Sequence, residues 1–487
     1  MKEKSLIKNF LYKSCLNLFN IVVPLIIGSY AYKVLGEKSM GKIVFADAIY
    51  AYFLIFASFG IYNYGLREIS RIRDNKEKLK SLFSSLFLMG LFSNILVLIV
   101  YISFILFRFK GTSNMTLYII YMFSIFSNIF YVEWANEALE KYDFITIKTI
   151  AVKVIYVVLL LGFIKNPEDY LIYAGLLSGS IFLNNIISFI FISKDIGFTL
   201  KGLTFKKHIK YLIMALIMSN ANVLYTQLDR LFIGSYLGET YTAFYAPAQN
   251  IVYMIYAFIM SIVYVTIPRL SNILASEDEE KYLKLLNKAT MSLSVFLFPA
   301  AVGIFVLSRE IILLYTKESY LASVPVLKMF SIYMISLAFD AVIANQIIYV
   351  KRKERILLKM ILSWGLVNLA MKLILAYSGF LSPFTAILST TIVNYMLVIT
   401  EYAYVRIGLK VDFDLIDIKK MKYLFISLIF IPISYGVKMI TSSTIYIILI
   451  TMTLCVAIYF SILLIIKDEI LLQVLDKMLI KLRKKSK

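Results

Sequence analysis

The sequence predicts an all-α integral membrane protein with fourteen transmembrane helices. Of its 487 residues 60% are hydrophobic and 17% charged, and the mean hydropathy is +0.80. Apolar runs of about 20 residues, the length needed to cross a bilayer, recur from one end of the chain to the other. A soluble chain of this length could not cover so much apolar surface, so the multi-pass membrane class follows.

The apolar runs give the expected helices in chain order. Almost none of the connections between them exceeds about 20 residues, so no soluble domain fits between two spans. The expected spans are 10–35, 43–65, 83–107, 117–136, 147–164, 170–192, 212–236, 243–267, 290–314, 323–350, 359–378, 383–405, 422–440 and 444–466.

The distribution of basic residues predicts the orientation. If the N-terminus is cytoplasmic, 38 of the 51 lysines and arginines fall on the cytoplasmic side, nine fall outside and four lie within spans. This positive-inside bias places both termini in the cytoplasm and the protein in the cytoplasmic membrane. The bias also accounts for the net charge of +21 without a nucleic-acid partner.

The basic segment after Ile466 is expected to meet the membrane surface. Leu471, Leu475, Met478 and Leu482 fall on one helical face, with lysines on the other. Such a helix suits the anionic inner leaflet, and a solvated helix end is the alternative.

Several classes of site are not expected. Cys15 and Cys455 lie inside apolar runs and His208 in a charged loop, so neither a disulfide framework nor a metal or histidine-based catalytic centre is predicted. The external loops, such as 166–169 and 238–242, are too short for an enzyme's catalytic loop. No phosphate-binding loop for ATP is present, so no cofactor is expected. The sequence leaves the energy source open between a proton or sodium gradient and mass action from downstream polymerisation.

An internal repeat divides the chain. Leu35-Gly36-Glu37 and Leu237-Gly238-Glu239 are 202 residues apart, and so are Arg67 and Arg269. Each half has six spans, an even number, so both insert with the same orientation. Parallel repeats of this kind are related by a pseudo-two-fold axis along the membrane normal. The predicted division is a six-helix bundle over 1–200, a second over 201–410, and two further helices with a basic tail over 411–487.

Three stretches carry a resemblance to a known family. They are "VLGEKSMGKIVFADAIYAYFLIFASFGIYNYGLREISR" (34–71), "YVEWANEALEKYDFITIKTIAVK" (131–153) and "DRLFIGSYLGETYTAFYAPAQNI" (229–251). The sequence resembles the polysaccharide flippases of the multidrug/oligosaccharidyl-lipid/polysaccharide exporter superfamily over its whole length. One departure is Ala243, which stands where the first repeat has Gly41.

The resemblance implies two six-helix bundles that form a V around a central cavity. It implies a flippase, not an enzyme, that moves an oligosaccharide on a polyprenyl pyrophosphate carrier from the inner to the outer leaflet by alternating access. The product would serve capsule or O-antigen synthesis, with a polysaccharide polymerase and glycosyltransferases as partners. Within the superfamily, a lipid II flippase and a drug/cation antiporter are the alternatives, although the charges within the spans lean basic.

Cations inside the spans are the first candidates for a pyrophosphate, because an unpaired anion is costly to bury. Arg230 suits phosphate through its planar guanidinium, and Lys153 lies near the inner leaflet, where the headgroup would enter. An interhelical ion pair explains Arg230 equally well. Asp229 shares a helical stripe with Asn222 and Tyr225, which suits sugar hydroxyls, a coupling ion or an interhelical contact.

The remaining candidates have equally simple structural explanations. Gln249 and Tyr253 share one face of the span 243–267, which suits sugars but also core packing. Arg67 and Arg269 lie at the cytoplasmic mouth, one in each half, as a gate or phosphate-capture pair, although the positive-inside rule already explains them. Structural ion pairs are expected between Asp340 and Lys372 and between Glu133 and Lys153.

Overall fold

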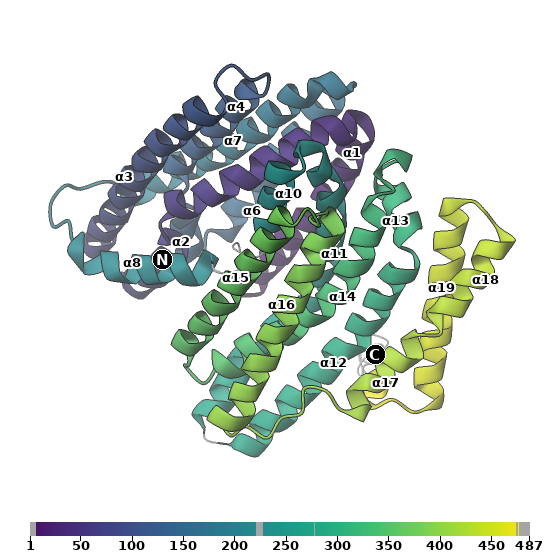
Figure 1. Cartoon of the computed structure of the whole chain (residues 1–487). Coiled ribbons are helices and arrows are strands. Elements are labelled where there is room, and N and C mark those ends of the chain that lie inside the picture. Colours follow the sequence, from purple (N-terminus) through teal and green to yellow (C-terminus); the bar gives the residue numbers. More distant parts are fainter. Residues whose placement is uncertain (1–5, 221–226, 277, 474–475, 477–487) are drawn as a thin grey trace, which may run out of the picture. The chain divides into compact units, whose positions relative to one another are not determined.

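A computed structural model describes residues 6–220, 227–276, 278–473 and 476. The described residues form helices joined by short turns, with no strand among them. They divide into two units, Met1–Ala243 and Phe244–Lys487, which are described separately below (Figure 1).

The first unit contains the N-terminal helices and ends just inside a helix that continues into the second. Its elements are α1 (Leu6–Ser58), α2 (Ile61–Ile72), α3 (Lys76–Arg108), α4 (Met115–Ser127), η1 (Asn128–Phe130), α5 (Glu133–Ala138), α6 (Tyr142–Phe163), η2 (Pro167–Asp169), α7 (Tyr170–Ile196), α8 (Lys206–Asn220), α10 (Leu228–Tyr236) and the start of α11 (Glu239–Ala275).

The second unit contains the remaining helices, and two of its elements are π-helical. The elements are α12 (Glu279–Val306), α13 (Ser308–Tyr315), η3 (Glu318–Tyr320), α14 (Ser323–Ala341), the π-helix η4 (Val342–Ile348), α15 (Glu354–Tyr377), α16 (Pro383–Ala403), the π-helix η5 (Tyr404–Gly408), α17 (Ile418–Ser427), α18 (Phe430–Ile440) and α19 (Thr444–Ile465).

Twelve helices among the described residues are long and apolar enough to cross a membrane. The first two expected spans fall largely within α1, which joins two helices across a break at Gly36. The seventh expected span includes residues 221–226, which lie outside the described residues. The all-α membrane class is confirmed. The count of fourteen spans and the cytoplasmic placement of both termini stay predictions.

The glycines of the Leu-Gly-Glu repeat both break a helix. Gly36 has φ 71° and ψ 175° and kinks α1, and Gly238, with φ 105°, separates α10 from α11. A positive φ strains any residue with a Cβ, so glycine is favoured at both turns. The repeated tripeptide therefore marks a helix break at a glycine with positive φ in each half.

The first repeat has a glycine, Gly41, where the second has Ala243, and the difference has a steric reason. The backbone of Gly41 lies against the first turn of α11, and a Cβ there would lie 2.7 Å from the Cα of Thr240. The hydroxyl of Thr242 donates a hydrogen bond of 2.9 Å to the Gly41 carbonyl. Ala243 is also fully buried, but it carries its Cβ, so the close backbone approach belongs to the first repeat.

Several helices begin at polar caps. Asn75 accepts a hydrogen bond from the Lys78 amide at the start of α3, and Asp278 caps α12. Ser382 and Thr385 form a reciprocal capping box at the start of α16, next to Pro383. These side chains satisfy amides that have no partner within the helix.

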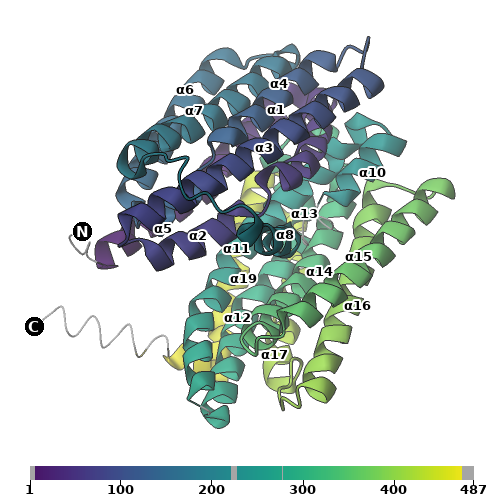
Figure 2. The same cartoon turned by 90° about the vertical axis from the view of Figure 1, so that its left-hand side faces the viewer.

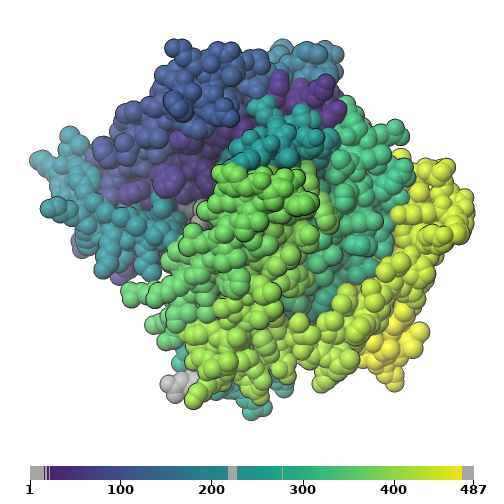
Figure 3. Space-filling view, viewed as in Figure 1, coloured from purple at the N-terminus to yellow at the C-terminus, as the bar shows by residue number. Residues whose placement is uncertain are grey.

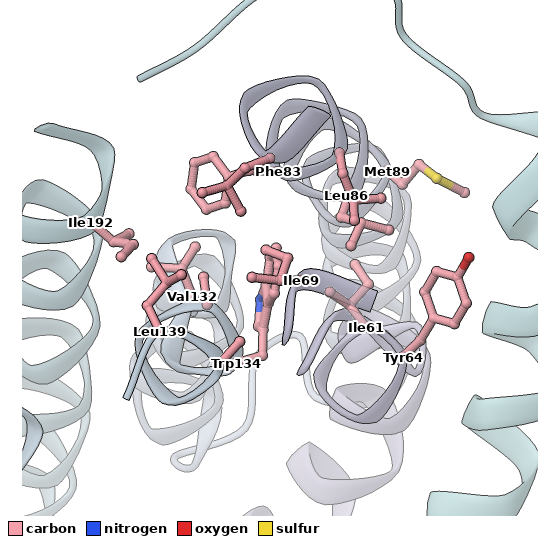
Figure 4. Close-up of a cluster of buried hydrophobic side chains, with 14 of the residues drawn as sticks. Ile61, Tyr64, Ile69, Phe83, Leu86, Met89, Val132, Trp134, Leu139 and Ile192 are labelled. Atoms are coloured by element: carbon pink, nitrogen blue, oxygen red, sulfur yellow. The ribbon is translucent and has the colours of Figure 1, made fainter. Parts of the chain in front are cut away.

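The core of the first unit fixes α5 between its longer neighbours. Trp134 of α5 is buried with Phe83 of α3, Ile69 of α2 and Ile192 of α7 (Figure 4). A Cβ at Gly65 would lie 2.5 Å from the Trp134 ring, so α2 and α5 pack tightly. Figure 2 shows α2 and α3 side by side, with α8 packed against α2.

The two units divide after residue 243, and the predicted division at residues 200 and 410 stays a prediction. Helices α8 and α10 pack against α1, and α8 also packs against α2, so both belong to the first unit. Only Asn368 and Lys372 of helix α15 are buried, as expected for a lipid-facing helix, and Figure 3 shows this part of the chain at the surface.

Candidate functional site

A pocket of about 490 Å³ lies within the first unit. It is bounded by α1, α2, α4, η1 and α7 and by the residue that precedes α10. No lysine, arginine, aspartate or glutamate lines it. The lining side chains are hydroxyls, amides, tyrosines and a few aliphatic groups: Tyr50, Ala51, Leu54, Ile55, Ser58, Gly60, Tyr62, Asn63, Ser124, Asn128, Tyr131, Ile181, Asn185 and Gln227.

Side-chain hydrogen bonds hold the amides of this pocket in place. The Asn128 side chain donates to Asn94 Oδ1 at 3.0 Å, and the Asn185 amide donates to Ser127 Oγ at 3.1 Å. Asn94 in turn donates to the Ala57 carbonyl at 3.0 Å. Two of the lining amides, Asn128 and Asn185, are therefore held in place by neighbouring side chains.

Two tyrosines form an aromatic wall. The rings of Tyr62 and Tyr131 are stacked with centroids 6.3 Å apart, and the Tyr62 hydroxyl donates to Glu137 Oε1 at 2.9 Å. Glu137 thus fixes Tyr62 from outside the pocket. Flat aromatic faces beside amides and hydroxyls suit a ligand that has both apolar ring faces and many hydroxyl groups.

Two buried oxygen atoms close to α10 have no hydrogen-bond partner in the described part of the chain. They are Gln227 Oε1, in the pocket, and the Tyr52 hydroxyl. A buried oxygen without a partner costs free energy, so it is expected to be satisfied by a ligand or by water.

Arg230, which is buried, forms an ion pair with the half-exposed Asp47 beside this pocket. Its Nη1 lies 3.6 Å from Asp47 Oδ2, and the Arg230 side chain is 9% exposed while that of Asp47 is 41% exposed. Asp229 is fully buried and lies close enough to Tyr52 for the two side chains to interact electrostatically. The Nη1–Oδ2 distance of 3.6 Å is longer than that of a direct hydrogen bond.

A second pocket, of about 520 Å³, lies across α1 from the first. Phe45, Ile49, Tyr52 and Phe53 of α1 line it, whereas Tyr50, Leu54, Ile55 and Ser58 face the first pocket. Arg108 and Glu239 also line it. Glu239 accepts hydrogen bonds from Asn114 Nδ2 at 2.8 and 3.0 Å, which hold the start of α11 against α4.

The structure places Lys153 and Glu133 in separate contacts. Lys153 Nζ donates to Asn20 Oδ1 at 2.5 Å. Glu133 instead pairs with Lys148, whose Nζ lies 3.0 Å from Glu133 Oε2 and 2.5 Å from Ser188 Oγ. Lys153 is five residues beyond Lys148, about 140° further round the helix, so it cannot point to the same partner.

Asp340 and Lys372 are also placed apart. Lys372 Nζ donates to Ser389 Oγ, Thr390 Oγ1 and the Ala386 carbonyl on α16. Asp340 interacts electrostatically with Glu401, a residue that the sequence analysis did not single out. The expected partners are thus not brought together, because each helix turns its charge toward α16 at a different height.

The other predicted residues have these positions. Gln249 is buried in α11, and the Tyr253 ring packs edge-on against Phe330, with centroids 6.3 Å apart. Arg67 is exposed and contacts Glu68, and Arg269 is exposed on α11. Asn222 and Tyr225 lie outside the described residues.

Sequence reasoning missed several members of the first pocket and its ion pair. Asp47 is a charge within an expected span, and the rule that singled out Arg230 applies to it as well. Asn128 and Asn185 had no comparable signal, because single amides in apolar helices usually bind neighbouring helices. No cluster of three or more metal-ligating side chains occurs among the described residues.

Comparisons with known proteins agree with this architecture. Residues 6–274 match the sequence model of a family described as "Polysaccharide biosynthesis protein", and residues 215–374 match the MatE model. A segment of 180 residues, 36% of the chain, is 24% identical to the "Putative O-antigen transporter" of Escherichia coli (strain K12) and spans 42% of that relative's length.

Two solved structures share the fold. The lipid II flippase MurJ, in an inward closed conformation, superimposes with a TM-score of 0.69 at 17% identity, over 94% of this chain and 99% of its own. An inward-facing multidrug resistance transporter of the MATE family has a TM-score of 0.59 at 14% identity, over 80% of this chain and 94% of its own. At these identities the likeness concerns the fold alone. With the family match over more than half of its length, the chain belongs to the polysaccharide biosynthesis protein family, as a multi-pass membrane protein of the multidrug/oligosaccharidyl-lipid/polysaccharide exporter superfamily.

Proposed function

We propose that this protein is a flippase that moves polyprenyl-pyrophosphate-linked oligosaccharides from the inner to the outer leaflet of the cytoplasmic membrane. The observation that carries the proposal is the pocket of the first unit, which is rich in amides and tyrosines and has no charged lining residue. Such a surface offers hydrogen bonds to hydroxyl groups and flat faces to sugar rings.

The ion pair beside the pocket supports a pyrophosphate carrier. Arg230 is the buried cation of this site, and Asp47 is its acidic neighbour at 3.6 Å. A pyrophosphate that approaches Arg230 would compete with the half-exposed Asp47 carboxylate for the guanidinium, with which a phosphate can form charge-assisted hydrogen bonds. In the absence of substrate, Asp47 keeps Arg230 from being an uncompensated buried charge.

The same geometry weighs against export of a cationic drug. A cation would require an acidic pocket, and the lining of this one contains no carboxylate. A lipid II substrate has the same pyrophosphate and a saccharide, so the two lipid substrates have to be distinguished by experiment.

The test is transfer of a fluorescent polyprenyl-pyrophosphate oligosaccharide across proteoliposomes that contain the purified protein. We expect Gln227→Leu to slow transfer about tenfold, the effect of one lost hydrogen bond to a sugar. The matched control is Gln473→Leu, because Gln473 is exposed on the surface and outside the pocket. Transfer of lipid II without transfer of the oligosaccharide lipid would indicate that lipid II is the substrate. Transfer of neither lipid, or equal rates in the two variants, would overturn the proposal.

A further inference from the structure

Two amide side chains of the first pocket, Asn128 and Asn185, have their nitrogen atoms bound to the protein. Asn128 Nδ2 donates to Asn94 Oδ1 at 3.0 Å, and Asn94 is fixed in turn because its own Nδ2 donates to the Ala57 carbonyl. Asn185 Nδ2 donates to the Ser127 carbonyl at 3.2 Å and to Ser127 Oγ at 3.1 Å. These partners determine which end of each amide is the nitrogen. The atom left for a ligand is therefore the carbonyl oxygen, which only accepts hydrogen bonds.

Two hydroxyl groups of the pocket also donate to the protein. Ser58 Oγ donates to the Ile55 carbonyl at 3.0 Å, and the Tyr62 hydroxyl donates to Glu137 Oε1 at 2.9 Å. A hydroxyl has a single hydrogen, so each of these groups can offer a ligand only a lone pair. Gln227 Oε1 is a further acceptor, and it is buried without a partner in the described part of the chain. Five lining groups thus present hydrogen-bond acceptors.

No positive charge offsets these acceptors, because no lysine or arginine lines the pocket. Two buried cations of the first unit are already paired with carboxylates: Lys148 Nζ lies 3.0 Å from Glu133 Oε2, and Arg230 Nη1 lies 3.6 Å from Asp47 Oδ2. In the function proposed above, Arg230 meets the pyrophosphate of the carrier, which is the same whatever sugars are attached. An acidic sugar would therefore enter this pocket without a counter-ion.

Negative charge lies behind one wall of the pocket. Glu137 Oε1 is 2.9 Å from the Tyr62 hydroxyl, and the Tyr62 ring stacks with that of Tyr131. The faces of aromatic rings carry partial negative charge, which suits the C–H groups of a sugar ring and repels an anion. An ionised carboxylate in this pocket would meet acceptors, ring faces and the nearby charge of Glu137. Each of these disfavours it.

We propose that the first pocket selects neutral, hydroxyl-bearing sugars and excludes acidic sugars such as uronic acids. This inference rests on the proposed transport of a lipid-linked oligosaccharide and names the class of saccharide that the pocket accepts. A sugar hydroxyl donates a hydrogen bond to the carbonyl oxygens of Asn128, Asn185 and Gln227. An ionised carboxylate has only acceptors and finds no complementary group there. Burying it without a partner costs free energy, so acidic sugars bind more weakly.

The test compares the binding of synthetic lipids to the purified full-length protein in detergent. All carry the same polyprenyl pyrophosphate and the same trisaccharide of neutral hexoses. In the acidic lipids one hexose, at each position in turn, has its hydroxymethyl group oxidised to a carboxylate. The lipids differ in this one group, so a difference in dissociation constant is due to the carboxylate. We expect the neutral lipid to bind about tenfold or more tightly than at least one acidic lipid.

Two variants test the origin of the selectivity. Glu137→Gln keeps an oxygen for the Tyr62 hydroxyl but removes the charge, so the ratio of the acidic to the neutral dissociation constant should fall severalfold. Gln227→Lys places a cation in the pocket and should reverse the preference. The matched control is Glu77→Gln, because Glu77 is exposed in the first turn of α3, outside the pocket, and should leave the ratio unchanged. The ratio is taken within each variant, so a general loss of affinity cancels.

Equal binding of the neutral lipid and every acidic lipid, or tighter binding of an acidic one, would overturn the inference. The same ratio in Gln227→Lys as in the unmodified protein would also overturn it. Transfer of the same lipids in proteoliposomes separates this inference from the flippase proposal. Preferential binding of the neutral lipid without transfer of any lipid would overturn the flippase and leave the selectivity. Equal binding and equal transfer of neutral and acidic lipids would do the opposite.

Discussion

Lys148 and Glu133 form a buried ion pair in the first unit, with Lys148 Nζ 3.0 Å from Glu133 Oε2. Ser188 completes the contact, because its hydroxyl lies 2.5 Å from both charged groups. The pair joins α5 to α6, and Ser188 attaches both to α7. Three helices thus depend on one buried charge pair.

Lys148→Met is expected to destabilise the protein by roughly 3 kcal/mol, because it leaves Glu133 as an uncompensated, mostly buried charge. Adding Glu133→Leu should recover much of that loss, since no charge then remains. Unfolding of the purified variants in detergent would measure both effects. Arg73→Met is the control, because the Arg73–Glu140 pair is about 40% exposed on each side and should change stability by less than about 1 kcal/mol. Equal losses in Lys148→Met and Arg73→Met would contradict this account.

Gly41→Ala should destabilise the first unit. A Cβ at Gly41 would meet main-chain atoms of Glu239 and Thr240, which cannot move as a flexible side chain does. We expect a loss of about 1–3 kcal/mol, typical of overpacking, seen as a lower melting temperature. Gly175→Ala is the matched control, because that helical glycine has open space around its Cβ position, and it should be neutral or slightly stabilising. A Gly41→Ala protein as stable as Gly175→Ala would show that the helices part easily.

Stability should fall at acidic pH through His208, which lies outside the expected spans. Its ring nitrogens hydrogen bond to the Tyr64 hydroxyl at 2.6 Å and to Thr204 Oγ1 at 2.9 Å. Burial lowers the pKa of His208, and the nearby Lys207 lowers that pKa further. As the pH falls, His208 is therefore protonated in the unfolded chain at a higher pH than in the folded protein. The contribution of neutral His208 to the free energy of unfolding is complete above about pH 6.5. It decreases as the pH falls from there toward the pKa of His208 in the folded protein.

Melting temperatures measured between about pH 8 and pH 5 would check this expectation. His208→Gln keeps an amide that can bond to Tyr64 or Thr204 but cannot titrate, so its melting temperature should fall less over the acidic range. Because His208 is the single histidine of the chain, the difference between the two curves reports on this residue. Parallel curves would assign the acid sensitivity to carboxyl groups instead.

The Asp47–Arg230 pair should respond asymmetrically to mutation if Arg230 binds pyrophosphate. Arg230→Gln is expected to slow lipid transfer by tenfold or more, the loss of a charge-assisted hydrogen bond. Asp47→Asn removes the competing carboxylate and should strengthen binding of the lipid, measured as a lower half-saturating concentration. Arg230→Lys should recover only part of the activity, because lysine lacks the planar fork. Equal losses for Asp47→Asn and Arg230→Gln would instead indicate a purely structural pair.

The sequence by itself determined the membrane class, the approximate positions of the spans and the Leu-Gly-Glu turns. These features depend on local properties: a bilayer requires about 20 apolar residues in a row, and a turn with positive φ favours glycine. Gly36 and Gly238 could therefore be recognised without any knowledge of packing.

Only the tertiary structure decided which charges meet. Glu133 pairs with Lys148 instead of Lys153, and Arg230 meets Asp47. The choice depends on how each helix is rotated about its axis and on its height relative to its neighbours, because five residues along a helix turn a side chain about 140° away. Packing over the whole helix surface sets that rotation and height. Hydropathy predicts where a span begins and ends, but not its rotation or its height relative to its neighbours.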